Sequence, residues 1–378
     1  MRIGFDAKRL YNNFTGLGNY SRTLVENLHR YFPEDEYYLY TPKIKEDITT
    51  RPFLENPAYR TTCHSGLTSS YWRTSLIKKD LKRDGIDIFH GLSHEIPLNI
   101  DRSGIRSVVT IHDLIFLTYP DMYTAIDRAI YNYKFRYACK HADKIIAISE
   151  CTKRDIVRYF GTPEKKIEVI YQAIQPTFYE MQSQEEATAT VKRYGLPTDY
   201  LLYVGAINSR KNLLGLVQAL TLLPESLRIP LVVVGNGHEY KEKVLRYAAK
   251  TGISNRLILV NNLHDPRELQ AFYQKACIFI YPSFHEGFGL PVTEALMSKV
   301  PVITSGQSSL PEAGGNAPCY IHPESPEDIA HGIESVLTDT ARRTEMIEEG
   351  FRFAHRQFDV QRLSGQVHQL YRQISSES

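Results

Sequence analysis

The chain has 378 residues, of which 42% are hydrophobic and 23% are charged, and its formal net charge is +2. This length is more than one ordinary hydrophobic core needs, so we expect about two domains. The sequence has no run of about 18 apolar residues, which argues against a membrane-spanning helix, and so small a net charge gives no reason to expect nucleic acid as a partner.

The cysteines and the N-terminus indicate the compartment. The five cysteines are odd in number and scattered, at positions 63, 139, 151, 277 and 319. Because no Cys-x-x-Cys pair occurs, they indicate neither a disulfide framework nor a zinc site. The N-terminus runs directly into Arg2-Ile3-Gly4-Phe5 without the profile of a signal peptide. We therefore expect free thiols and a cytoplasmic protein.

The first half of the chain alternates short apolar runs with polar or helical sequence. The runs that suit buried strands are Ile3 to Ala7, Tyr37 to Tyr40, Ile86 to Phe89, Val108 to Ile111, Ile145 to Ile148 and Ile167 to Tyr171. Such alternation predicts an α/β fold with a parallel sheet covered on both faces. In that architecture ligands bind where strands end at their carboxyl side.

A pair of glycines follows the first of these strands. Gly16 and Gly18 stand in Thr15-Gly16-Leu17-Gly18-Asn19-Tyr20, just before a helix predicted for about Asn19 to Tyr31. Bare backbone at such a place can approach a phosphate or a sugar. Because Gly-x-Gly is equally typical of an ordinary turn, both interpretations stay open.

Polar residues stand at the ends of three predicted strands, namely His90, His112 and Ser149. Their position favours a functional role. We single out His112, since Asp113 beside it could orient the ring. Adjacent residues on a strand point apart, however, so a backbone partner for the ring is an equal alternative. His90 and His94 are weaker candidates for the acceptor side of a site.

Two segments mix basic residues with aromatic ones, Tyr71 to Asp84 and Arg128 to Lys144. A solvated helix face explains such a mixture. Contact with an anionic membrane or with a lipid-linked acceptor is the alternative. We therefore hold open a peripheral association with the inner membrane face.

The second half repeats the pattern of the first. The sequence between Pro176 and Pro197 is polar and has no strand pattern, so we place the domain crossing there. Strands are then expected at Tyr200 to Gly205, Pro230 to Gly235, Arg256 to Val260, Cys277 to Tyr281 and Pro301 to Ser305. The expected organisation is two doubly wound, Rossmann-like domains over residues 1–178 and 196–355, followed by a C-terminal helix over 356–378.

The turn after the first strand of the second half carries two adjacent cations, Arg210 and Lys211. The chain has no Asp-x-Asp pair that would hold a metal. Two cations at a strand-to-helix turn suit the charge of a diphosphate leaving group. An ordinary charged surface is the alternative.

The most distinctive stretch reads Ser-Phe-His-Glu-Gly-Phe-Gly-Leu-Pro-Val-Thr-Glu-Ala, from Ser283 to Ala295. It leads from an apolar run into a helix that we expect to begin at Pro291. Gly287 and Gly289 allow a sharp turn and a close approach of ligand, and the N–H groups of the first helical turn attract an anion.

Two carboxylates frame this turn. Glu286 precedes the glycines, and Glu294 lies about one helical turn past Pro291, so both can face one small volume. Two carboxylates are compatible with a bound phosphate if they bind hydroxyl groups while the backbone binds the phosphate. A nucleotide sugar requires both kinds of contact. A strand-to-helix turn in which Glu294 merely favours the helix N-terminus is the alternative.

Glu286 and Glu294, with Gly-Phe-Gly-Leu-Pro between them, resemble the E-x7-E signature of retaining glycosyltransferases of family 4, which have the GT-B fold. The resemblance extends over nearly the whole chain and includes His90-Gly91-Leu92, Thr110-Ile111-His112-Asp113, Ile146-Ala147-Ile148-Ser149-Glu150, Arg210-Lys211-Asn212 and Leu310-Pro311-Glu312. It implies two Rossmann-like domains facing across a cleft, with the acceptor on the first and the nucleotide sugar on the second. The terminal helix would return to the first domain.

The resemblance also implies roles. Glu294 would bind ribose hydroxyls, and Glu286 with the amides of Phe288 to Leu290 would hold the donor sugar. His112 would reach that sugar near its reacting face. Retention would follow from attack on the same face, with the leaving phosphate taking the acceptor's proton. No cofactor or metal is expected.

The two cations would draw off the diphosphate. Many family members carry an arginine directly after the glycine, where this chain has Ala206. It is therefore open whether Arg210 takes over part of that role, and Lys211 is the firmer candidate. Asn262 and Leu263 follow another strand and would border the nucleotide base, although loop sequence explains them equally well.

The complete set of candidates is Glu286, His112, Lys211 and Arg210 for catalysis, and Gly16, Gly18, Gly287, Phe288, Gly289, Leu290, Glu294, Asn262 and Leu263 for donor binding. The turn sequences look most like those of bacterial polysaccharide mannosyltransferases, which suggests GDP-mannose as donor and a glycan or lipid-linked glycan as acceptor. UDP-glucose and UDP-N-acetylglucosamine are rival donors. A nucleotide-sugar epimerase or hydrolase, and a catalytically silent sugar-binding protein, are the rival classes.

Overall fold

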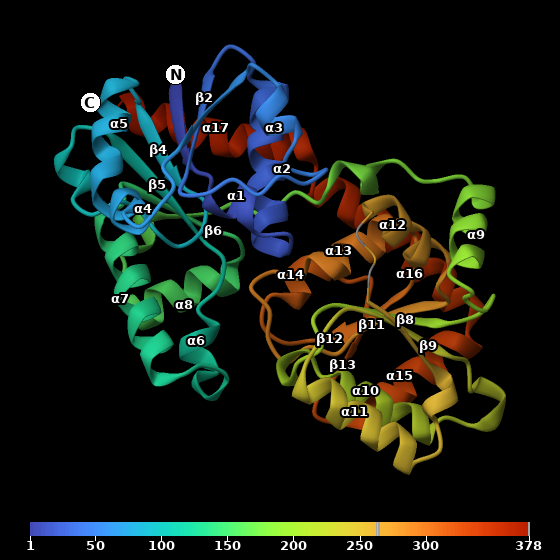
Figure 1. Ribbon diagram of the computed structural model, residues 1–378. Coiled ribbons are helices and arrows are strands. Elements are labelled where there is room, and N and C mark those ends of the chain that lie inside the picture. Colours follow the sequence, from blue (N-terminus) through green and yellow to red (C-terminus); the bar gives the residue numbers. More distant parts are fainter. Residues whose placement is uncertain (262, 264, 377–378) are drawn as a thin grey trace. The chain divides into compact units, whose positions relative to one another are not determined.

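The computed structural model describes residues 1–261, 263 and 265–376 (Figure 1). The chain divides into two compact units, of which the first comprises Met1–Ala173 and the chain from Phe358 onward, and the second comprises Ile174–Gln357. Each unit is built on one parallel sheet, so the prediction of two doubly wound domains is confirmed. Across the residues described, none of the helices has the length and apolar character needed to cross a bilayer.

The first unit contains a seven-stranded sheet in the order β3-β2-β1-β4-β5-β6-β7. The strands are β1 (Arg2–Asp6), β2 (Glu36–Thr41), β3 (Tyr59–Cys63), β4 (Ile88–Gly91), β5 (Arg106–Ile111), β6 (Lys144–Ala147) and β7 (Ile167–Val169). The strand order reverses between β1 and β4, which makes the carboxyl edge at that point a usual place for ligands.

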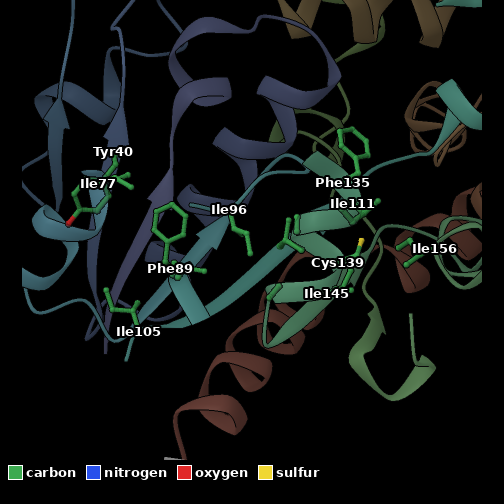
Figure 2. Close-up of a cluster of buried hydrophobic side chains, with 14 of the residues drawn as sticks. Tyr40, Ile77, Phe89, Ile96, Ile105, Ile111, Phe135, Cys139, Ile145 and Ile156 are labelled. Atoms are coloured by element: carbon green, nitrogen blue, oxygen red, sulfur yellow. The ribbon is translucent and has the colours of Figure 1, made fainter. Parts of the chain in front are cut away.

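The helices of the first unit are α1 (Lys8–Asn12), α2 (Gly16–Tyr31), α3 (Pro52–Glu55), α4 (Ser69–Tyr71), α5 (Ile77–Arg83), α6 (Ile115–Thr118), α7 (Ala125–His141), α8 (Glu150–Phe160) and α17 (Val360–Ser376), with a π-helix, η1 (Trp72–Leu76), between α4 and α5. Apolar side chains from β4, β5 and β6 pack with α5, α7 and α8. Figure 2 shows Ile111 and Ile145 of neighbouring strands near Phe135 and Cys139 of α7.

The second unit contains a six-stranded sheet in the order β10-β9-β8-β11-β12-β13. Its strands are β8 (Leu201–Val204), β9 (Leu231–Val234), β10 (Leu257–Val260), β11 (Ile278–Tyr281), β12 (Val302–Ser305) and β13 (Cys319–Ile321). Its helices are α9 (Gln184–Arg193), α10 (Leu213–Leu222), α11 (Glu239–Lys250), α12 (Pro266–Lys275), α13 (Leu290–Met297), α14 (Leu310–Gly314), α15 (Pro326–Thr338) and α16 (Thr340–Gln357). A single 3-10 turn, η6 (Ser209–Lys211), follows β8.

Each strand expected from the sequence exists, and two further strands were not expected. The edge strand β3 reads Tyr-Arg-Thr-Thr-Cys and is only partly buried, so it lacks the apolar run that marks the other strands. The edge strand β13 has three residues, which is too short for a periodic signal. The helix α2 begins at Gly16, three residues earlier than the predicted Asn19.

The segment that the sequence analysis left between the domains is ordered helix in the second unit. A capping box joins Ser183 and Glu186 at the start of α9, and α9 packs against α12 with Ala187 and Val191 buried. The contacts divide the chain between Ala173 and Ile174, ahead of the expected crossing.

The terminal helix α17 belongs to the first unit and packs against α2. The hydroxyl of Tyr371 lies 2.5 Å from Nδ1 of His90, at the end of β4. His368 Nε2 lies 2.9 Å from a carboxylate oxygen of Asp35, whose other oxygen accepts from the N-terminal amine of Met1 at 2.6 Å. Both ends of the chain are thus fixed to one another within this unit.

Two helical glycines of the first unit provide a test of packing. A Cβ atom at Gly18 would lie 1.7 Å from the carbonyl oxygen of Asn13, whereas a Cβ at Gly365 would meet no atom within 4 Å. We expect Gly18→Ala to lower the free energy of unfolding in urea by about 1–3 kcal/mol through overpacking. Gly365→Ala should raise it by up to about 1 kcal/mol, because alanine favours helix. Equal stability of the two variants would contradict this packing.

Candidate active site

Two loops meet at the carboxyl edge of the second sheet. The first follows β8 and contains η6, and the second follows β11 and leads into α13. The amide of Phe284 donates to the carbonyl of Arg210 at 2.9 Å, and Ser283 Oγ lies 3.2 Å from the same carbonyl. These bonds hold the two predicted motifs against one another.

Glu286 is buried at the centre of this junction and is surrounded by donors. Its Oε2 lies 2.9 Å from Arg210 Nη1, and its Oε1 lies 3.2 Å from Lys211 Nζ. The hydroxyls of Tyr281 and Ser283 donate to Oε1 at 2.9 Å and 2.8 Å. Burial by itself raises the pKa of Glu286, but Lys211 and Arg210, with the hydrogen bonds, lower it to about 2. The carboxylate is therefore ionised at neutral pH.

Lys211 lies beside this carboxylate and is largely shielded from solvent, with 12% of its side chain exposed. Its ammonium group donates to the hydroxyl of Tyr281 and lies 4.9 Å from the centre of that ring. The amide of Lys211 donates to Oδ1 of Asn208 at 3.1 Å, which fixes the turn. A Cβ at Gly205 would lie 3.3 Å from Lys211 Cδ, so a glycine there leaves room for the lysine chain. Burial lowers the pKa of Lys211, while the charge of Glu286 raises it.

Glu294 lies on α13 and acts on the same ammonium group. Its Oε2 accepts from the hydroxyl of Tyr273 at 3.0 Å. Burial raises the pKa of Glu294 to about 7, even though that hydrogen bond and the charge of Lys211 oppose the rise. Lys211 is in turn attracted by both Glu286 and Glu294. Glu286 therefore contacts the lysine directly, and Glu294 acts on it through its charge.

The glycine turn between the carboxylates is closely packed. Gly289 caps α13 in the left-handed region, with φ 115° and ψ 43°, and a Cβ there would lie 2.8 Å from Leu310 Cδ2. The helix begins at Leu290, one residue before the predicted Pro291. Only glycine combines this φ with this approach. Phe288, in the same turn, is buried.

The loop before α14 supports this turn from a part of the chain to which we assigned no role. Ser309 Oγ lies 2.8 Å and 2.9 Å from the carbonyls of Glu286 and Phe288 and can donate to either of them. Ser308 Oγ accepts from the amide of Glu286 at 3.0 Å. The adjoining Leu310-Pro311-Glu312 was the available signal for these serines. The sequence did not indicate a role for Tyr273 and Tyr281, because a tyrosine in a buried helix or strand is indistinguishable from an ordinary core residue.

In the first unit, His112 is buried with both ring nitrogens occupied. Nε2 lies 2.9 Å from the carbonyl of Leu92 and therefore carries the proton, and Nδ1 accepts from Gln172 Nε2 at 3.0 Å. Burial is the main reason that the pKa of His112 is lowered to about 4. The ring is neutral and is oriented by a backbone carbonyl, which was the alternative to orientation by Asp113.

The other two histidines are also packed into the first unit. His90 binds the hydroxyl of Tyr371 through Nδ1 and that of Thr110 through Nε2, the latter at 2.8 Å. Burial lowers the pKa of His90 to about 3. His94 has φ 63° and stacks on Phe135 with ring centres 4.2 Å apart. These contacts join strand ends to helices α7 and α17.

The two glycines after β1 differ from one another. The amide of Gly18 donates to Asn13 Oδ1 at 3.0 Å, and a side chain at Gly18 would collide with the Asn13 carbonyl. A Cβ at Gly16 would meet nothing within 4 Å. Of the pair, Gly16 leaves open space for a ligand, and Gly18 serves close packing. Asn262 lies outside the described residues, and Leu263 is half-buried.

The chain is similar to known proteins over nearly its whole length. Residues 14–178 match the family model for Glycosyltransferase Family 4, and residues 189–353 match that for glycosyl transferases group 1. The O-antigen chain mannosyltransferase B of Escherichia coli is 30% identical over 359 residues, which cover 90% of this chain and 92% of that protein.

Solved structures show the same fold at low identity. The Anabaena protein HepE in complex with UDP and glucose has a TM-score of 0.76 and 16% identity, over 98% of this chain and 99% of that one. The sucrose-phosphate synthase from Thermosynechococcus elongatus has a TM-score of 0.79 and 19% identity, over 100% of both chains. The fold and the site define a glycosyltransferase of the GT-B class. The chain belongs to glycosyltransferase family 4.

The raised pKa of Glu294 predicts a pH-dependent stability. The folded protein holds this proton with a pKa of about 7, against an ordinary value of 4.5. The stabilisation is therefore fully present below about pH 4.5 and is lost as the pH rises to about 7. Glu294→Gln keeps an acceptor for Tyr273 and cannot ionise. We expect its thermal midpoint to exceed that of the parent by more at about pH 8 than at about pH 5. The corresponding difference in the free energy of unfolding should be up to about 3 kcal/mol.

The matched control is Glu348→Gln, on an exposed position of α16. The difference in thermal midpoint between this variant and the parent should be the same at both pH values. An offset for Glu294→Gln that does not change with pH would show that Glu294 is ionised throughout this range.

Proposed function

We propose that the protein is a retaining glycosyltransferase that moves mannose from GDP-mannose to a glycan or lipid-linked glycan. The main support is the ion-paired group of Arg210, Lys211 and the buried Glu286, with Glu294 acting on the same lysine. Charges are buried in such number only when they are paired or serve a ligand. The similarity to an O-antigen chain mannosyltransferase supports the choice of mannose and of polysaccharide synthesis.

In this proposal the cations meet the diphosphate. Arg210 and Lys211 both contact Glu286, so Glu286 holds them in place before a donor binds. A diphosphate that develops charge as the sugar leaves would attract both cations. The two side chains would supply the positive charge that a metal supplies in other transferases, so we expect no metal requirement.

The carboxylates recognise hydroxyl groups. Glu286 is ionised and accepts hydrogen bonds, so it suits hydroxyls of the donor sugar. Glu294, with a pKa of about 7, suits ribose hydroxyls because it can accept in its ionised form and donate in its neutral form. The amides of residues 288–290 complete the donor site.

The first unit would bind the acceptor. His112 has both ring nitrogens occupied within that unit, so we propose that it shapes the site and positions backbone rather than transferring a proton. The acceptor hydroxyl would then lose its proton to the leaving phosphate, and attack on the face that the phosphate leaves retains the configuration of the sugar.

The role of the cations is tested by turnover. We expect Lys211→Ala and Glu286→Ala each to lower kcat by at least about 100-fold, the scale of losing one contact made in the transition state. Lys250→Ala, at an exposed position on α11, is the matched control and should leave kcat unchanged. Turnover near that of the parent in both site variants would refute the assignment.

The donor is identified by thermal shift. A ligand that binds only the folded protein raises the thermal midpoint, by an amount that grows with its affinity. We expect GDP and GDP-mannose to raise it more than UDP, UDP-glucose or UDP-N-acetylglucosamine. A larger rise of the midpoint with the uridine compounds would mean that the donor is a uridine nucleotide sugar and not GDP-mannose. Loss of donor in a buffer without acceptor would indicate an epimerase or hydrolase, and binding without transfer to any acceptor would indicate a silent sugar-binding protein.

A further inference from the structure

A groove of about 430 Å³ lies along helix α7 of the first unit, outside the donor site. Its apolar walls come from the loop after β4 and from α7, and they are formed by Ile96, Leu98, Ala129, Ile130, Tyr133 and Tyr137. Ile130 and Tyr133 remain 45% and 64% exposed, and Ile126, one turn earlier on α7, is 73% exposed. An apolar stripe at helical spacing is thus left open to a ligand.

The groove lining also includes the charged side chains of Glu95 and Lys134, and we call this part of the groove its charged end. Glu95 Oε2 accepts from Arg73 Nη1 at 2.8 Å and from Lys134 Nζ at 3.2 Å, and Arg73 Nε also donates to Asp6 at 2.9 Å. Lys8 joins this group electrostatically, and burial together with the charge of Arg73 lowers its pKa. The Lys8 ammonium group has no ion-pair or hydrogen-bond partner among the residues that the structure describes. The group has three cations, Lys8, Arg73 and Lys134, and two carboxylates. One net positive charge therefore remains to bind an anionic head group.

The charged end lies at the carboxyl edge of the first sheet. Asp6 closes β1, and Glu95 follows β4, so both stand at the carboxyl edge beside the point where the strand order reverses. The groove is firmly built. A Cβ at Gly91 would lie 2.1 Å from the carbonyl oxygen of Glu95, and the amide of Leu98 donates to the carbonyl of Thr74, in the π-helix η1, at 2.7 Å. Such π-helical turns are frequent at functional sites.

We propose that this groove binds the first carbons of a lipid phosphate that carries the acceptor, with its phosphate at the Lys8 and Lys134 end. This rests on the proposed transferase function and names the class of acceptor. From Ile126 to Lys134 the helix advances about 12 Å, enough for a chain of about ten carbons. A sugar in the groove would leave its hydroxyls against apolar walls, which disfavours a glycan there.

The single tryptophan makes the test direct. Trp72 stands in η1 next to Arg73, and it is the chain's one tryptophan. We would titrate the whole protein with farnesyl phosphate below its micelle concentration and follow tryptophan fluorescence. We expect saturable binding that Ile130→Glu weakens by at least about tenfold, since a charge replaces part of the apolar wall. Tyr133→Ser, at a still more exposed position, should weaken it in the same direction.

Ile48→Glu makes the same substitution at an exposed isoleucine outside the groove and should change the affinity by less than about twofold. Equal affinity of the parent and the groove variants would overturn the proposal. Farnesol should bind about tenfold more weakly than farnesyl phosphate, and Lys8→Met should remove that preference. Equal binding of the two would overturn the assignment of the charged end.

Vesicles of anionic phospholipid distinguish a bilayer from a single lipid. If Ile130→Glu reduced vesicle binding and left the affinity for farnesyl phosphate unchanged, α7 would be a membrane contact and the proposed lipid site would be wrong. The titration contains no nucleotide sugar. Its failure would therefore leave the transferase function standing, and loss of transfer in the Lys211 variant would leave the lipid site standing.

Discussion

The contact between Lys211 and Glu286 is the interaction on which the second unit's site depends. An isolated charge in a protein interior is strongly unfavourable, so each of these groups requires the other. The lysine comes from the turn after β8 and the glutamate from the loop after β11. Their attraction therefore fixes two neighbouring loops of the sheet in one position. Arg210 strengthens this because it binds the same carboxylate and also the carbonyl of His285.

The same surroundings give two glutamates opposite properties. Glu286 has two cations and two hydroxyl donors, and its pKa is about 2. Glu294 has one hydroxyl donor and a more distant lysine, and burial raises its pKa to about 7. Neighbouring charges outweigh burial in the first case, and burial outweighs them in the second. One carboxylate can therefore remain a fixed negative charge while the other changes its protonation near neutral pH.

The first unit uses its polar residues differently. Its buried His90 and His112 are neutral, because burial lowers the pKa of the rings to about 3 and about 4, and their nitrogens bind groups of the same unit. One group of its charged residues, Asp6, Glu95 and Lys134, lies around Arg73 at the edge formed by β1 and β4. This division agrees with the requirements of a transferase. The donor's diphosphate needs concentrated positive charge, whereas an acceptor needs a shaped surface and orientation.

The sequence alone determined the two doubly wound units and the motifs that carry the proposed site residues. Apolar runs separated by amphipathic helices specify parallel sheets locally, and the glycine, proline and glutamate pattern of Ser283 to Ala295 is visible in consecutive residues. The short edge strands β3 and β13 escaped prediction, because partial burial and short length leave no periodic signal. Only the tertiary structure decided that Tyr273, Tyr281, Ser308 and Ser309 support the glutamates, and that His112 is neutral. Those properties depend on hydrogen bonds between segments far apart in the chain and on how deeply each group is buried, and local sequence encodes neither.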